Sequence, residues 1–177
     1  ESLVLRLPRR VTQDLGKLPV NLKFLDLRNG RWVGRLPPNL TSLSLNCYHF
    51  DKLVSYLPSK SVRKFNFQVI KEIEDDEYFS YKDEVGELPP HSLDFAAQFP
   101  NLTQLQINGN GLEWLLNKPL PPRLTELKIR CSNFNQPLVD LPPRLTTLKI
   151  WSDLFDQPLD HLPNHGIGPS TIGPEDR

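Results

Sequence analysis

LPPRLTELKI, residues 120–129, recurs almost unchanged as LPPRLTTLKI at 141–150 and as LPPNLTSLSL at 36–45. The first two of these stretches begin 21 residues apart. A period of this length built on Leu-x-x-Leu-x-Leu/Ile is typical of a structural unit that stacks on copies of itself. Such arrays usually present an extended surface to a partner, so the sequence predicts a repeat protein that binds instead of catalysing.

The repeat continues on both sides of these stretches. When each unit is numbered from its first apolar residue, position 1 falls at Leu22, Leu40, Val62, Leu102, Leu124 and Leu145. Position 4 holds Leu25, Leu43, Phe65, Leu105, Leu127 and Leu148, and position 6 holds Leu27, Leu45, Phe67, Ile107, Ile129 and Ile150. Position 11 holds Trp32, Phe50, Glu72, Leu112, Phe134 and Phe155, of which only Glu72 is not apolar. This alternation predicts strands with one buried face that join in a parallel sheet, and residues 1–6 open the chain inside a further apolar strand.

Leu-Pro pairs close the units, and the chain holds 18 prolines in all. Proline fixes φ and prevents a helix from running on. The side of each unit opposite the sheet is therefore predicted to be extended or short 3₁₀ helix.

Leu105-Gln-Ile107-Asn-Gly-Asn110-Gly-Leu112 resembles the leucine-rich-repeat consensus Leu-x-Leu-x-x-Asn-x-Leu. Phe134-Asn-Gln-Pro-Leu138 and Phe155-Asp-Gln-Pro-Leu159 resemble, more narrowly, the FNIP repeats within that class. The resemblance is firm over about 120–163 and looser elsewhere, with Phe50-Asp-Lys-Leu53 as a weaker copy. Bacterial effector leucine-rich repeats share Leu-Pro-Pro-x-Leu but lack Phe-Asn-Gln-Pro, so they rank second.

The predicted fold class is an α/β repeat. It is a curved leucine-rich-repeat solenoid with a parallel sheet on the concave face and a mostly irregular or 3₁₀ convex side. The solenoid spans 1–163 and includes an acidic insertion at about 71–95, and a tail rich in Gly and Pro follows at 164–177. Residues 92–99 predict a short convex-side helix, with Leu93, Ala96 and Ala97 at helical spacing and Pro100 ending it.

The outward positions 3, 5 and 7 of each strand are free to vary without harming the core, so they are the expected partner-binding surface. The residues favoured for this contact are Gln104, Gln106, Asn108, Glu126, Lys128, Arg130, Lys149 and Trp151. An arginine beside a tryptophan is common at interface hot spots. The insertion stretch 71–87 has eight acidic and two basic residues. It is interpreted either as a solvated loop or as a second contact anchored by Tyr78, Phe79 and Tyr81.

The sequence has no signature of catalysis, because it contains no nucleophile elbow, phosphate loop or His-Glu-x-x-His. We therefore expect no enzyme activity, no cofactor and no metal site, since Pro163 breaks the spacing of His161 and His165. The expected function is recognition of a protein partner. The alternatives are a structural component of an assembly, with self-association through an open C-terminal end, and the substrate-receptor arm of a ubiquitin ligase. The FNIP resemblance implies this last role, although no F-box is present.

Charge and cysteine content limit which kinds of partner and which cellular compartment are expected. Basic and acidic residues balance at 21 each, which favours neither nucleic acid nor a membrane surface. Cys47 and Cys131 fall at one repeat position at least three units apart, too far for a bridge, and free thiols favour an intracellular, cytoplasmic protein. The sequons at Asn39 and Asn101 keep secretion as the alternative.

Overall fold

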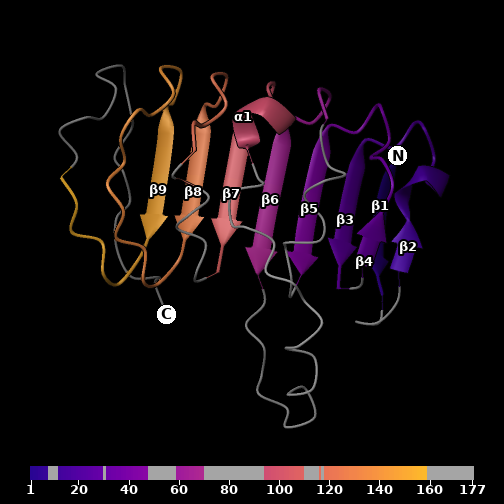
Figure 1. The fold of residues 1–177 in the computed structure, drawn as a ribbon, viewed down its shortest axis with the longest axis horizontal. Helices are drawn as coiled ribbons and strands as arrows, with labels where there is room; N and C mark the ends of the chain where they lie inside the picture. The colour runs from indigo at the N-terminus through magenta and orange to yellow at the C-terminus, as the bar shows by residue number, and fades with distance from the viewer. Residues whose placement is uncertain are drawn as a thin grey trace, which may run out of the picture.

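The computed structural model describes residues 1–7, 12–29, 31–47, 59–69, 94–109, 116 and 118–158. Within them the chain forms one row of seven strands in the order β1-β3-β5-β6-β7-β8-β9 (Figure 1). All six neighbouring pairs are parallel. The strands are β1 Ser2–Arg6, β3 Phe24–Arg28, β5 Ser42–Cys47, β6 Lys64–Val69, β7 Gln104–Asn108, β8 Glu126–Arg130 and β9 Thr147–Trp151. Each strand lies beside the next one of this sheet along the chain, so the fold is a solenoid of stacked coils, as the repeat predicts.

The strand register matches the repeat alignment residue by residue. The position-4 residues pair with one another in register on every strand from β3 (Leu25) to β9 (Leu148). The position-6 residues do the same from Leu27 to Ile150. Every side chain at positions 1, 4 and 6 of the six units is at most 2% exposed. β1 adds a seventh strand in the same register, with Leu3 beside Leu25. The buried face of the sheet is therefore the solenoid core.

The Leu-Pro-Pro-x-Leu motif forms a turn that leads into β5, β8 and β9. The Leu40 amide donates to the Pro37 carbonyl at 3.2 Å, and Leu124 repeats this bond to Pro121 at 3.0 Å. The second proline thus occupies the second residue of a hydrogen-bonded four-residue turn, where its fixed φ is favoured. The Leu-Pro closures are turns whose conformation proline fixes in advance.

Threonine at position 2 ties four of the six coils to the one before it. The hydroxyl of Thr103 donates to the Arg63 carbonyl at 3.0 Å, Thr125 to Thr103 at 3.0 Å and Thr146 to Thr125 at 3.1 Å. Thr41 makes the same bond to Lys23. The Leu-Thr dipeptide of the repeat therefore has a structural role, because its leucine fills the core and its threonine joins neighbouring coils.

The sequon asparagines have partners in the fold as well. The side-chain amide of Asn39 donates to the Val20 carbonyl at 3.1 Å, and that of Asn101 donates to the Lys60 carbonyl at 2.9 Å. Both bonds reach back to the turn of the preceding coil. Contacts within the solenoid therefore account for the Asn-Leu-Thr triplets without glycosylation.

We expect the Thr125→Val variant to lose about 1 kcal/mol of the free energy of unfolding, because valine keeps the shape of the side chain but cannot donate to Thr103. Urea denaturation followed by circular dichroism measures the loss. Thr147→Val is the matched control, since Thr147 lies on the solvent-facing side of β9 and should change stability by less than about 0.5 kcal/mol. Equal losses in the two variants would show that the threonine hydrogen bonds between coils do not contribute to stability.

The longest gap in the repeat adds no strand to the sheet. Residues 62 and 102 both occupy position 1, yet β6 pairs directly with β7, so Phe65 lies beside Leu105. The stack continues across this gap in the same register as elsewhere. Tyr78, Phe79 and Tyr81 lie outside the described residues.

The predicted helix is present but buries a different face. α1 spans Phe95–Gln98 and begins at Asp94, whose side chain accepts from the Ala97 amide at 2.9 Å. Phe95 and Phe99 are fully buried, whereas Ala97 is exposed. Figure 1 shows α1 at the starting ends of β6 and β7. The helical spacing of Leu93, Ala96 and Ala97 suggests that the alanines pack on the core, and this is wrong. The larger side chains of Phe95 and Phe99, at i and i+4, fill the space next to Phe65 instead.

Where the structure describes the segments between the strands, they are mainly irregular, with the short 3₁₀ helix η1 at Leu15–Lys17. A second, two-stranded parallel sheet pairs β2, Thr12–Asp14, with β4, Arg31–Val33. The sequence predicts extended backbone there but not this pairing. Near the other end, Phe134 stacks on Phe155 with ring centroids 5.7 Å apart. These two position-11 side chains pack coil against coil.

Cys131 is buried, and its thiol donates to Asn133 Oδ1 at 3.1 Å. It follows β8, and Cys47 ends β5, so β6 and β7 separate the two residues. Three strand spacings are about 14 Å, beyond the reach of a disulfide. Among the described residues, no helix is both long enough and apolar enough to cross a membrane.

Candidate functional site: the polar face of the sheet

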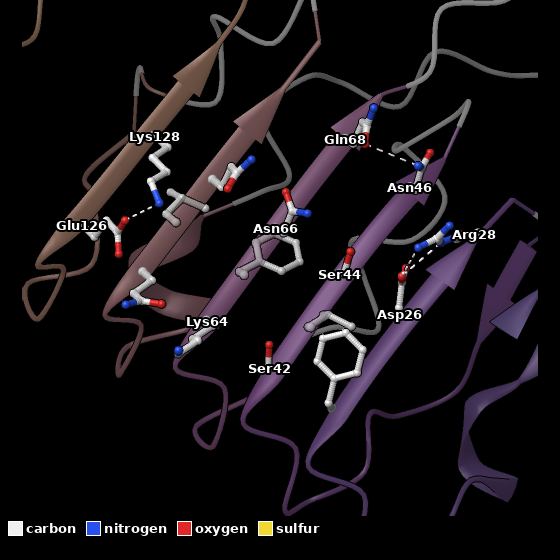
Figure 2. A pocket seen from close by; sticks show the side chains of 16 residues that line it. Asp26, Arg28, Ser42, Ser44, Asn46, Lys64, Asn66, Gln68, Glu126 and Lys128 are labelled. Carbon is white, nitrogen blue, oxygen red and sulfur yellow. Dashed lines mark hydrogen bonds and ion pairs between the residues drawn. The ribbon is translucent and has the colours of Figure 1, made fainter. Parts of the chain in front are cut away.

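The side chains at positions 3, 5 and 7 form one continuous surface, which we call the polar face. It contains a groove of about 410 Å³ that crosses β3, β5, β6, β7 and β8 (Figure 2). Polar residues make up most of its lining: Asp26, Arg28, Ser42, Ser44, Asn46, Lys64, Asn66, Gln68, Gln104, Gln106, Glu126 and Lys128.

The groove is hollowed over β5 because that strand presents small side chains. Ser42 lies in register between Phe24 and Lys64. Ser44 lies in the same way between two longer side chains, those of Asp26 and Asn66. Figure 2 shows both serines on the floor, with longer side chains on the strands to either side. A contrast in side-chain size between adjacent coils thus creates the depression.

Asp26 stands at one end of the groove and is only 6% exposed. Its Oδ2 accepts from Arg28 Nε at 3.0 Å and from Arg28 Nη2 at 2.8 Å. Asp26 raises the pKa of the Arg28 guanidinium, first by this hydrogen bond and then by its charge, so Arg28 stays protonated. Asp26 Oδ1 is buried and has no hydrogen-bond partner. Only one of the two carboxylate oxygens of Asp26 therefore accepts a hydrogen bond.

Amide side chains occupy the middle of the face at the ends of β5, β6 and β7. Asn46 Nδ2 donates to Gln68 Oε1 at 3.4 Å, and Asn108 Nδ2 donates to Asn66 Oδ1 at 3.1 Å. Gln106 Nε2 donates to Asn108 Oδ1 at 3.2 Å. Asn46 Oδ1, like Asp26 Oδ1, is buried without a partner. Two unsatisfied acceptors therefore lie on the neighbouring strands β3 and β5.

At the far side of the groove Glu126 and Lys128 form an ion pair on β8 (Figure 2). Beyond the groove, the Arg130 guanidinium lies 4.3 Å from the centroid of the Trp151 ring. Within this chain Arg130 already covers a face of that tryptophan. The pair stands on the last two strands of the polar face. At this separation a cation and an aromatic ring attract each other.

The structure places the residues favoured by the sequence in two groups. Gln104, Gln106, Glu126 and Lys128 line the groove. The other four, Asn108, Arg130, Lys149 and Trp151, lie on the same face outside the lining. The groove also extends to the earlier strands β3, β5 and β6, which the favoured set omitted. One signal in the sequence could have pointed to the groove. The unit that begins at Leu40 has serine at positions 3 and 5, whereas the unit before it has phenylalanine and aspartate there.

The described residues include no cluster of three or more His, Cys, Asp or Glu side chains that could hold a metal ion. The acidic groups of the polar face, Asp26 and Glu126, stand on separate strands, and each has a basic partner. This face can offer a ligand hydrogen bonds and charge pairing, together with apolar contacts from lining residues such as Phe24.

Comparison with protein-family models, curated proteins and solved structures finds no match to this chain.

Proposed function

We propose that this chain is a non-enzymatic protein-recognition module that receives its partner on the polar face. The observation that carries the proposal is the groove, in which five neighbouring strands contribute hydrogen-bonding and charged side chains to one depression. These side chains stand on strands whose opposite faces are fully buried, so the core holds them in place. A binding surface built on rigid strands loses little entropy when a partner docks.

We also propose that the solenoid is of the leucine-rich-repeat type, with FNIP-like units and the polar face on its concave side. The support is the common register of positions 4 and 6 and the coil-to-coil stacking of Phe134 on Phe155. Phe134 and Phe155 begin the two Phe-Asn/Asp-Gln-Pro-Leu motifs. Proteins of that type commonly use the sheet face for partner recognition, which agrees with the position of the groove.

Ser44→Arg tests the binding face by filling the groove from its floor. We expect affinity capture from cell lysate to retain a specific protein on the unchanged chain and to lose it on this variant by about tenfold or more, because the new side chain occupies the partner's space. Val139→Arg is the control, since Val139 is 60% exposed and does not line the groove. Equal capture by Ser44→Arg and the unchanged chain would remove the groove from the interface. Arg130→Glu combined with Trp151→Ala then tests the remaining end of the face.

A second candidate function is a component of an assembly, and the sheet edges favour it. Within the described residues, β1 and β9 each pair with one strand only, and Val4 on β1 is 54% exposed. Unpaired strand edges tend to join other strands. Light scattering distinguishes the two candidates: an oligomer of fixed stoichiometry supports assembly through an edge, whereas a monomer that captures a partner through the groove supports recognition.

A further inference from the structure

We infer that the groove recognises an acidic segment of its protein partner. A partner carboxylate lies against Lys64. This inference rests on the proposed recognition function and adds the chemistry of the partner. Two features carry it: the charge of the polar face and the surroundings of Lys64.

The polar face is basic although the whole chain has a net charge of zero. Six basic side chains occupy its positions 3, 5 and 7, against two acidic ones, a net of +4. Both acidic groups are already neutralised, Asp26 by Arg28 and Glu126 by Lys128. The charge left to attract a partner is therefore positive, which favours acidic segments at the encounter stage.

Lys64 is the basic group best placed to bind an acidic side chain of the partner. It is exposed, lines the groove near its centre and has no ion pair among the described residues. Its neighbours in register are Ser42 on β5 and Gln104 on β7. A hydroxyl and an amide beside the ammonium group can also donate to a carboxylate, so this part of the groove supplies donors to an anion.

Nucleic acid is also anionic, but the chain as a whole has a net charge of zero and so no general attraction to a phosphate backbone.

Selection from a random twelve-residue peptide library displayed on phage tests the inference without knowledge of the natural partner. We expect peptides enriched on the unchanged chain to carry an excess of Asp and Glu over the input library, and Lys64→Glu to abolish that excess. Lys23→Glu makes the same charge change at an exposed residue outside the groove and should preserve it. For one selected peptide, fluorescence anisotropy should show an affinity loss of about fivefold to tenfold in Lys64→Glu, as expected for reversal of one exposed charge contact.

The outcomes separate this inference from the function on which it rests. Peptides without an acidic excess that Ser44→Arg nevertheless releases would overturn the acidic partner and leave the groove as the binding site. Peptides indifferent to both Lys64→Glu and Ser44→Arg would overturn both. If no peptide is enriched but a labelled oligothymidine binds and is lost in Lys64→Glu, the groove reads nucleic acid and the inference fails.

Discussion

Replacing Phe65 with alanine is expected to lower the free energy of unfolding by about 3–5 kcal/mol, since it removes a fully buried ring from a close-packed core. The Phe65 ring lies 5.2 Å from the ring of Phe99, 5.9 Å from that of Phe95 and 6.2 Å from that of Phe67, measured between centroids. Phe65 therefore links the central strand β6 to α1. Chemical denaturation followed by tryptophan fluorescence and circular dichroism measures the effect.

Phe65→Leu separates the contribution of the aromatic contacts from that of core filling. Leucine stands at the equivalent position of the other five units, so this variant keeps an apolar side chain of the common type. We expect it to lose about 1–2 kcal/mol, because the ring contacts disappear while most of the volume remains. If Phe65→Leu matched Phe65→Ala, core filling would be unimportant, and if it matched the unchanged chain, the aromatic cluster would add nothing.

Gly109→Ala is the second variant with a large expected effect, about 2 kcal/mol or more of lost stability. Gly109 follows β7 with φ at +118°, a conformation that side-chain-bearing residues rarely adopt. A Cβ atom there would also lie 2.9 Å from the Val69 carbonyl oxygen on the adjacent coil. Thermal and urea denaturation should both report the loss.

Gly16→Ala is the matched control for Gly109→Ala. No positive φ constrains Gly16, and a Cβ atom there would meet only the Asp14 side chain, at 3.2 Å. A change well under 1 kcal/mol is expected, because that side chain can move slightly. Equal losses at Gly16 and Gly109 would mean that a general preference for glycine, and not the special backbone conformation, explains both.

The sequence alone predicts the sheet well because two constraints repeat in every unit. Position 4 and position 6 must be apolar to fill the core, and proline must open the turn into the strand. Those requirements fix the register from Leu25 to Leu148 without any three-dimensional information. The β2–β4 pair is different, since its three-residue strands are too short for a pattern to emerge. The buried face of α1 was also missed, because neighbouring Phe65 decides it.

The polar face follows from the same repeat, but the groove within it does not. Alternation assigns Ser42, Ser44 and Lys64 to the outer side of their strands. The depth of the surface, however, depends on which coils lie next to each other and on the relative size of their side chains. The unsatisfied oxygens of Asp26 and Asn46 are likewise invisible in a sequence, because burial and hydrogen-bond geometry define them.

Direct pairing of β6 with β7 makes this joint a natural place for protein engineering. The connection from position 1 of one coil to position 1 of the next is 40 residues here, against 21 between the last two coils, yet the register is the same. Loop closure costs only about 0.6 kcal/mol for each doubling of length. A foreign domain with closely spaced termini could therefore be grafted between these strands, turning the solenoid into a carrier that displays cargo while its polar face stays unaltered.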